Sequence, residues 1–250
     1  MKLGVMLPNE VEDADPREIA RLAQRAEELG YTSVWLPDHL LPPGPFGDVF
    51  GGVHEALMLL ANIAARTERI TLGTSVLILP LREPVLLAKQ LATLERLAPG
   101  RVILGAGVGW QEDEFAALDV PFNRRGKRTD EILALVAEAH ATGRLRGGVL
   151  APRPTARIPL LIGGKSEAAL RRAARVGDLW QAYNVTPEAW VGMRDRLDEL
   201  AGERKVSAGT VIRAQRGMDL KAEAERWRAV GAEHLAIHPG RLEGAAELLA

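Results

Sequence analysis

One stretch near the middle of the chain combines a bare backbone with side chains that can do chemistry. Gly105, Gly107 and Gly109 alternate at the end of a buried apolar run, so another group can approach the backbone closely. Trp110 follows directly, and residues 112–114 are all carboxylic acids, which can donate or accept protons. The stretch therefore predicts a strand whose end forms one wall of a pocket.

Histidine is the side chain that titrates near neutral pH, and two histidines follow predicted strands. Asp38 and His39 follow the apolar run 33–36 after one proline, and His238 ends the last such run. A position at a strand end favours a catalytic role for His39 with Asp38 beside it, whereas the role of His238 stays open. Three others fall on predicted helices or at strand starts, where structural roles are more common: His54, His140 and His234.

The run Gly163-Gly164-Lys165-Ser166 lies between a predicted strand and a predicted helix. It is not a complete Walker A loop, because Pro159 occupies the position of that loop's first glycine. The glycines before Trp110 likewise lack the third glycine of a dinucleotide-binding fingerprint. Two glycines before a helix N-terminus still expose N–H groups that can bind an anion, so we predict a phosphate site there, with Lys165 and Ser166 as further donors. The alternative is a tight turn with Ser166 as N-cap and Lys165 exposed.

The sequence has one basic cluster, formed by Arg124, Arg125, Lys127 and Arg128. Positive charge at the start of a helix opposes the helix dipole by roughly 0.3–1 kcal/mol per charge. We therefore expect acidic partners nearby, either Asp130 and Glu131 or residues 112–114. The alternative partner is the anionic tail of a cofactor.

The pattern of apolar residues predicts the scaffold that positions these candidates. Short buried runs alternate with amphipathic segments along the chain, which is typical of parallel strands covered by helices. The predicted strands are residues 3–7, 33–36, 70–79, 102–106, 158–162, 179–182, 209–212 and 235–238. The predicted helices are residues 16–29, 54–66, 84–97, 130–141, 166–176, 190–200, 220–227 and 242–249.

Eight strand–helix units in 250 residues indicate an α/β fold, a single (β/α)8 TIM barrel domain over residues 1–250. Residues 108–128 are predicted to be an irregular insertion after the fourth strand. The active site of such barrels lies at the carboxyl ends of the strands. Asp38, His39 and the glycine-rich strand ends are therefore expected to share one rim.

Composition limits the function classes. The formal net charge of -1 gives no reason to expect nucleic acid or a membrane surface as a partner. The chain has no cysteine, which excludes disulfides and thiolate metal sites, and no histidine pair has metal-ligand spacing. Because no apolar run approaches the roughly 20 residues of a membrane span and the start does not resemble a secretory leader, we expect a cytoplasmic protein without a metal.

Several motifs, in this order along the chain, resemble those of the bacterial luciferase-like superfamily of flavin and deazaflavin oxidoreductases. The motifs are residues 26–35 with Asp38-His39, residues 66–74, residues 82–84 with 87–89, residues 100–110 with Glu114-Phe115, residues 159–164 and residues 173–178. The resemblance covers essentially the whole chain. It implies a compact luciferase-like barrel with shortened insertions.

The resemblance also implies a flavin or deazaflavin ring across the barrel mouth. Ser75-Val76 occupies the position where the deazaflavin branch has a non-prolyl cis peptide that supports the ring. His39 would face the ring and the substrate. Glycines of the fourth strand end would leave space for the ring, Trp110 would form a wall, and the glycine turn would hold the cofactor phosphate. These remaining cofactor-binding candidates are Gly107, Gly109, Trp110, Gly163, Gly164, Lys165 and Ser166.

The predicted function is hydride transfer between a bound deazaflavin, coenzyme F-420, and a small organic substrate, with His39 as proton donor or acceptor. The first alternative is an FMN-dependent monooxygenase that uses reduced flavin and oxygen. The second is a non-catalytic flavin-binding protein. A Schiff-base aldolase that uses Lys165 would need a desolvated lysine, which a barrel rim does not favour.

Two features depart from the sugar-phosphate dehydrogenases of this superfamily. Trp110 stands where those relatives have a glutamate, which argues against the same substrate. Residues 215–219 are too few for the large insertion that many relatives carry, so we expect a pocket that is open or completed by a second subunit. The expected partners are a small-molecule substrate, a second copy of the chain in a homodimer, and a separate flavin or deazaflavin reductase.

Overall fold

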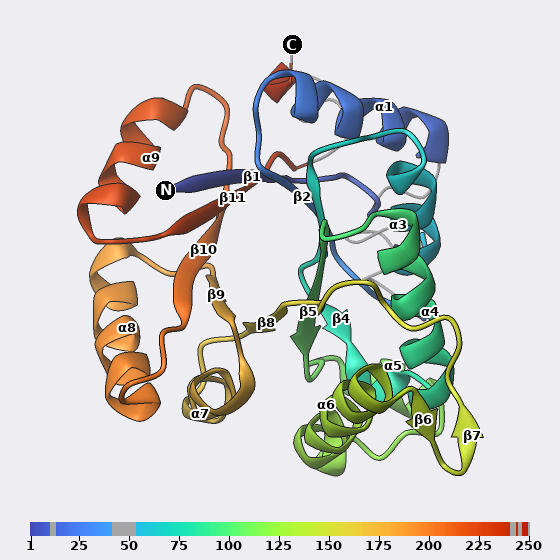
Figure 1. The fold of residues 1–250 in the computed structure, drawn as a ribbon. Helices are drawn as coiled ribbons and strands as arrows, with labels where there is room; N and C mark the ends of the chain where they lie inside the picture. Colours follow the sequence, from blue (N-terminus) through green and yellow to red (C-terminus); the bar gives the residue numbers. More distant parts are fainter. Residues whose placement is uncertain (11–13, 42–53, 241–243, 245–246, 250) are drawn as a thin grey trace.

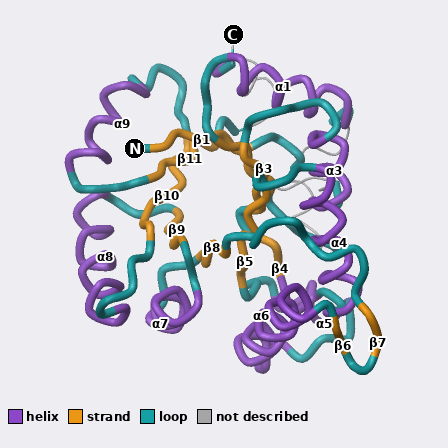
Figure 2. Tube along the Cα trace, viewed as in Figure 1, coloured by secondary structure: helices purple, strands orange, loops and turns teal. Residues whose placement is uncertain are grey.

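Parallel strands close into a barrel in the computed structural model, which describes residues 1–10, 14–41, 54–240, 244 and 247–249 (Figure 1, Figure 2). The barrel has eight strand positions, which we call staves. β3 and β4 form one interrupted stave, and the pairing of both with β5 closes the ring. The predicted TIM barrel and its strands are confirmed. The strands of the barrel are β1 (Lys2–Met6), β2 (Ser33–Leu36), β3 (Thr71–Thr74), β4 (Leu77–Ile78), β5 (Val102–Gly107), β8 (Leu160–Gly163), β9 (Leu179–Tyr183), β10 (Ser207–Arg213) and β11 (His234–His238).

The strands are short apolar runs because both of their faces are covered. One cluster of buried side chains comes from separate staves and fills the lumen: Met6, Trp35, Leu161, Val211 and Ala236. The outward side chains pack against helices in a larger, continuous core. Two buried faces per strand explain why the sequence shows continuous apolar runs rather than alternation.

Helices form the outer layer of the barrel (Figure 1). They begin where the sequence supplies caps: Asp15 accepts a hydrogen bond from the Arg17 N–H at 2.8 Å, and Thr186 accepts one from the Ala189 N–H at 3.3 Å. Among the helices of the described residues, none has the length and apolar character needed to cross a bilayer. Half of the predicted last helix, over 242–249, falls outside the described residues. The helices of the outer layer are α1 (Pro16–Glu28), α3 (Ala56–Ala64), α4 (Pro84–Leu97), α6 (Arg125–Thr142), α7 (Glu167–Val176), α8 (Pro187–Ala201) and α9 (Leu220–Ala229).

The segment after β5 is more regular than predicted. It contains α5 (Glu112–Ala117) and the 3-10 turn η2 (Phe122–Arg124), and α6 starts five residues earlier than the prediction of 130. The fully buried Phe115 meets Phe122 edge-on at 5.2 Å between ring centroids, so the two short elements share a small core of their own. The predicted irregular insertion is therefore wrong. After α6 the chain forms a short hairpin of β6 (Arg144–Leu145) and β7 (Gly148–Val149).

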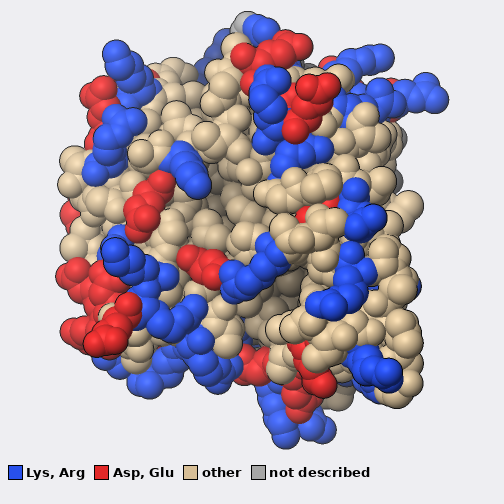
Figure 3. Space-filling model, in the orientation of Figure 1, with Lys and Arg blue, Asp and Glu red and all other residues tan. Residues whose placement is uncertain are grey.

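The basic cluster at the start of α6 finds several kinds of partner. Lys127 forms an ion pair with Glu131 at 3.8 Å, as one of the two expectations proposed. Arg128 donates through Nε to the carbonyl of Pro80 at 2.7 Å, and the Arg125 guanidinium lies 3.8 Å from the centre of the Phe122 ring. Carbonyl and aromatic contacts thus replace most of the acidic partners that the sequence predicts. On the face drawn in Figure 3, acidic and basic side chains are intermingled at the left and at the bottom, while much of the right edge is uncharged.

His234, at the start of β11, gives the barrel a predicted acid sensitivity. Burial, together with the charge of Lys2, lowers the pKa of His234 from 6.5 to about 4. The folded state therefore favours the neutral ring, and its stabilisation, on the order of 3 kcal/mol, is present above pH 6.5 and lost as the pH falls toward 4. Urea unfolding at pH 7 and pH 5 should show a loss on the order of 2 kcal/mol that His234→Gln abolishes. Equal pH dependence in both proteins would contradict this assignment.

Candidate active site

A cavity of about 740 Å³ opens at the carboxyl ends of the staves. Every stave contributes to its lining, as expected for the functional end of such a barrel. Of the residues predicted from the sequence, Ser166 alone is absent from this lining. The cavity gathers Asp38, His39, Ser75, Val76, Gly107, Gly109, Trp110, Gly163, Gly164 and Lys165.

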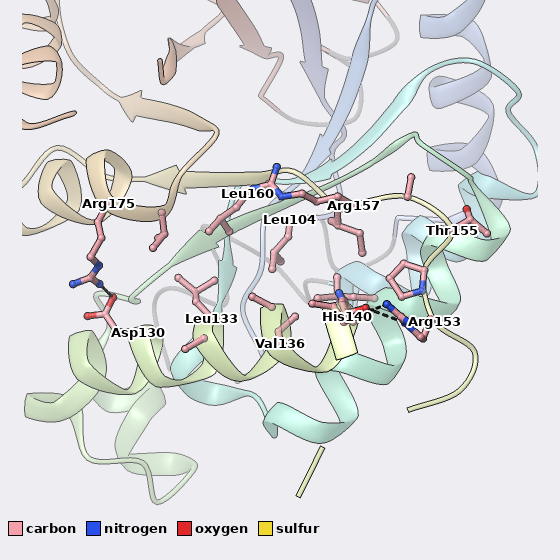
Figure 4. A pocket seen from close by; sticks show the side chains of 18 residues that line it. Leu104, Asp130, Leu133, Val136, His140, Arg153, Thr155, Arg157, Leu160 and Arg175 are labelled. Carbon is pink, nitrogen blue, oxygen red and sulfur yellow. Dashed lines mark hydrogen bonds and ion pairs between the residues drawn. The ribbon is translucent and has the colours of Figure 1, made fainter. Parts of the chain in front are cut away.

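A larger cavity of about 840 Å³ lies outside the barrel, between α6, the C-terminus of α7 and the segment that leads into β8 (Figure 4). Leu104, Leu133 and Leu160 give it an apolar interior. Its histidine, His140, donates to the Ala88 carbonyl at 2.9 Å, and burial lowers the pKa of this ring. The lining includes no residue from the carboxyl end of a described strand. The smaller cavity, which holds the strand-end side chains, is therefore the candidate active site.

His39 is held by a buried carboxylate. Its Nδ1 lies 2.9 Å from Oε2 of Glu114, and the other oxygen of Glu114 accepts hydrogen bonds from the N–H groups of Leu40 at 2.6 Å and Leu41 at 3.0 Å. Burial alone would raise the pKa of Glu114, but the hydrogen bond from His39 and those two N–H groups outweigh it and hold the pKa below its usual value. An ionised Glu114 accepts the proton on Nδ1, so the basic lone pair of His39 is on Nε2.

This contact corrects one expectation about the acidic run at 112–114. The sequence suggests these acids as partners of the basic cluster at 124–128, whereas Glu114 has a fully buried side chain and binds His39 and the chain after it. α5 makes this possible, because its first turn carries Glu114 back over the end of β2. Trp110 lies on the other side, with its ring centroid 6.1 Å from that of His39 and perpendicular to it.

Asp38 lies in the same cavity wall but has other partners. One carboxylate oxygen accepts the Ile78 N–H at 2.9 Å, and the other forms an ion pair with Arg82, which also pairs with Glu55. The Asp38 side chain is fully buried. Burial raises the pKa of Asp38, and the Arg82 guanidinium and the Ile78 N–H oppose that rise. The carboxylate thus ties the end of β2 to the end of β4.

The floor of the cavity is built around Val76. The Ser75–Val76 peptide bond is cis, as the resemblance implies. A Cβ atom on Gly107 would lie 2.3 Å from Cγ2 of Val76, and one on Gly163 would lie 2.6 Å from Cγ1. The two glycines therefore leave space for the Val76 side chain itself. Gly109, with φ +76°, leaves space for Phe115 and Ile78 in the same way. The glycines of the β5 end were expected to clear room for a ring, whereas the space at Gly107 and Gly109 is filled by side chains of the protein itself.

Gly107→Ala tests this view of the floor. The added methyl group must displace Val76, and overpacking of this kind costs about 1–3 kcal/mol. Urea unfolding should show that loss. The matched control is Gly192→Ala on α8, where a Cβ atom would meet nothing within 4 Å and alanine should stabilise by about 0.5–1 kcal/mol. Equal stability of the Gly107→Ala and wild-type proteins would contradict the packing described.

Comparison with known proteins identifies the family. Residues 1–238 match the model of the luciferase-like monooxygenases. The chain belongs to the luciferase-like monooxygenase family. It is accordingly an oxidoreductase.

Named relatives of the family share parts of the chain or the fold. The chain is 38% identical over 176 residues to a protein of Beutenbergia cavernae named F420-dependent glucose-6-phosphate dehydrogenase. The matched region covers 65% of this chain and 51% of that protein. The chain thus spans about half the length of this relative. A solved F420-dependent secondary alcohol dehydrogenase in complex with an F420-acetone adduct has a TM-score of 0.81 at 17% identity, over 99% of this chain and 97% of the other. Monooxygenase RslO1 from Streptomyces bottropensis has a TM-score of 0.74 at 25% identity, over 92% and 78%.

The predicted phosphate turn of this family member has internal partners. Gly164, with φ +125°, donates its N–H to the Gln181 carbonyl at 3.1 Å, and Ser166 accepts the Ala169 N–H at 3.2 Å as the N-cap of α7. Lys165 is exposed and lies 3.5 Å from the Asn184 carbonyl. This is the tight turn given above as the alternative, and phosphate binding there stays a prediction.

Two polar side chains of the cavity, Glu10 and Gln181, had no role assigned from the sequence. Nε2 of His238 lies 3.3 Å from Oε2 of Glu10, while the Gly240 N–H donates to Nδ1 at 3.1 Å, so Nε2 carries the proton. The sequence places His238 at the rim, but Glu10 follows β1 in a loop with no motif to single it out. On β9, Gln181 accepts the Ser75 hydroxyl at 2.6 Å. Its buried Nε2 has no hydrogen-bond partner among the described residues, which leaves one donor for a bound group.

Proposed function

We propose that this chain transfers a hydride between a bound deazaflavin, coenzyme F-420, and a small organic substrate. The observation that carries the proposal is the His39–Glu114 pair, which puts a basic Nε2 in the cavity at the carboxyl ends of the strands. Proton transfer by a positioned histidine is what hydride transfer to or from a carbon–oxygen bond requires. The names of the relatives, two of which contain F420-dependent, support the choice of cofactor.

The cavity has features that fit a flat ring system. Val76 projects from between Gly107 and Gly163 as an apolar ledge, and the unpartnered Nε2 of Gln181 lies in the same lining. The ledge would support the face of a ring, and Gln181 would donate to one of its carbonyl oxygens. Lys165 would hold the anionic tail at the rim. The remaining cofactor contacts, with Gly109, Trp110, Gly164 and Ser166, are proposed as predicted from the sequence.

The chain's own residues supply orientation and a proton site. When bound, a deazaflavin accepts or donates the hydride as a two-electron carrier. In the oxidising direction Nε2 of His39 takes the hydroxyl proton of the substrate as its C–H hydride leaves and the carbon–oxygen bond becomes double. Glu114 keeps the proton of His39 on Nδ1 and stabilises the charged ring that results. Asp38 acts through position: it holds the chain before His39 against β4.

Two other functions remain as outcomes of the test. A luciferase-like monooxygenase would bind reduced FMN, and RslO1 is named as a monooxygenase, but the features above do not need FMN. A non-catalytic flavin-binding protein would have no use for a buried carboxylate behind His39. A homodimer and a reductase partner stay predictions.

Visible absorbance titration tests the proposal directly. Purified protein should perturb the spectrum of the oxidised deazaflavin saturably, and the Gly107→Ala variant should bind it more weakly because Val76 is displaced. FMN titrated under the same conditions is the comparison. Saturable binding of FMN with no perturbation of the deazaflavin spectrum would favour the monooxygenase instead.

A further inference from the structure

We propose that the substrate is an uncharged hydroxyl or carbonyl compound rather than a phosphorylated one. This inference rests on the proposed hydride-transfer function and concerns the substrate side of the same cavity. It departs from the glucose-6-phosphate dehydrogenase relative, whose substrate carries a phosphate group.

The charges of the described lining are few and unevenly placed. Besides the two histidines, the aspartate, glutamate, lysine and arginine side chains of the lining are Glu10, Asp38 and Lys165. Asp38 is buried and paired with Arg82, so it adds little net charge to the cavity. The described lining therefore offers one cation, Lys165, and one carboxylate that faces the cavity, Glu10. The partner of Glu10 in the lining is His238, not a lysine or an arginine.

These two charges lie on opposite sides of the barrel. β8, which leads to Lys165, is separated from β1 by three staves in either direction around the ring. β1 leads to Glu10, and its direct neighbours β2 and β11 lead to His39 and His238. The proton-transfer side of the cavity thus has an anion at its centre, and the cation is at the far wall with the proposed cofactor tail.

Glu10 makes this side unsuitable for a phosphate. His238 donates its single Nε2 proton to Glu10, since its Nδ1 accepts the Gly240 N–H. A substrate phosphate beside His39 would meet the Glu10 carboxylate, and on this side of the cavity the described lining has no arginine or lysine to offset the repulsion, since Lys165 lies at the far wall. A neutral hydroxyl or carbonyl group meets no such penalty. The side chains of Met6 on β1 and Val211 on β10 give the same side an apolar character.

The sequence of the segments outside the described residues adds little positive charge. Residues 11–13, 42–53, 245–246 and 250 contain no lysine or arginine, and Glu12, Asp13 and Asp48 among them are acidic. Arg241 is the one basic residue outside the described part of the chain. It is therefore the residue that must be tested as a phosphate ligand.

The test uses the purified protein loaded with oxidised deazaflavin. Its spectrum should respond saturably to cyclohexanone, and cyclohexanol should reduce the cofactor, whereas glucose 6-phosphate should give kcat/KM at least about tenfold lower. A higher kcat/KM for glucose 6-phosphate, or saturable spectral perturbation by the phosphate or by neither compound, would overturn the inference. Failure of the deazaflavin to bind at all would instead sink the proposed function, so the two failures are distinguishable.

Variants locate the cause of the selectivity. Glu10→Gln and Glu10→Lys should raise the kcat/KM ratio of glucose 6-phosphate to cyclohexanol, by about tenfold or more for the charge reversal. Unchanged deazaflavin affinity shows that these variants are folded. Arg241→Ala should leave the ratio unchanged. Loss of phosphate turnover in Arg241→Ala, or an unchanged ratio in Glu10→Lys, would show that Glu10 does not set the substrate class.

Discussion

Alanine in place of His39 should lower kcat by about 100- to 10,000-fold while the deazaflavin still binds. The substitution removes Nε2, which we propose as the site that takes or gives the substrate proton. It leaves Glu114 with the N–H groups of Leu40 and Leu41, so the loop keeps two of its three contacts to that carboxylate. The measurement is the initial rate of the deazaflavin absorbance change at saturating substrate.

A second substitution separates chemistry from structure. His39→Asn can still donate a hydrogen bond to Glu114 but has no basic nitrogen, so it should lose as much kcat as His39→Ala and keep more stability. Free imidazole should restore part of the rate of His39→Ala, because the truncated side chain leaves a space of matching shape beside Glu114. A wild-type kcat in either variant would remove His39 from the mechanism.

The barrel could be predicted from the sequence because each of its strands is buried on both faces. Runs such as 33–36 and 235–238 are predominantly apolar, and amphipathic segments such as 16–29 and 84–97 alternate with such runs along the chain. Residues 108–128 could not be predicted in the same way. α5 and η2 meet through the contact between Phe115 and Phe122, and a single aromatic pair gives too few apolar positions to establish a helical or strand period.

Glu114 shows where site prediction from sequence ends. Its place among three consecutive acids suggested proton chemistry, and the basic cluster at 124–128 offered these acids possible partners. The contact to His39 joins residues 75 positions apart, and it depends on how α5 turns back over the end of β2. Sequence order carries no signal for such a contact without an alignment. The same holds for Glu10 and His238. They meet because β1 and β11, the first and last strands of the chain, are neighbours in the barrel.

The glycines illustrate a different limit. Gly105, Gly107 and Gly109 were expected to permit a close approach, and the group that occupies the space at Gly107 is the Val76 side chain. A glycine in the sequence indicates that space is needed at its position, but it does not identify the group that fills the space. Val76 then presents to the cavity the apolar surface that these glycines were thought to leave for a ring.

Alanine in place of Asp38 should give the largest loss of stability, about 3 kcal/mol, because it removes one partner of a buried ion pair. Arg82 is almost as buried, with 9% of its side chain exposed, and would keep the partly exposed Glu55 alone. The Ile78 N–H would lose its acceptor as well. Urea unfolding measures the loss, and kcat should fall with it, since Asp38 fixes the chain directly before His39.

Two variants divide that loss between charge and hydrogen bond. Asp38→Asn keeps an acceptor for the Ile78 N–H and removes the charge, so it should lose less stability than Asp38→Ala. Asp38→Ala combined with Arg82→Leu should lose less than the sum of the two single changes, because no unpaired guanidinium remains buried. The exposed pair of Lys127 and Glu131 is the matched surface control, where Glu131→Ala should change the free energy of unfolding by less than about 1 kcal/mol. If Asp38→Ala were as mild as Glu131→Ala, the ion pair would not be what joins β2 to β4, and the position of His39 would need another explanation.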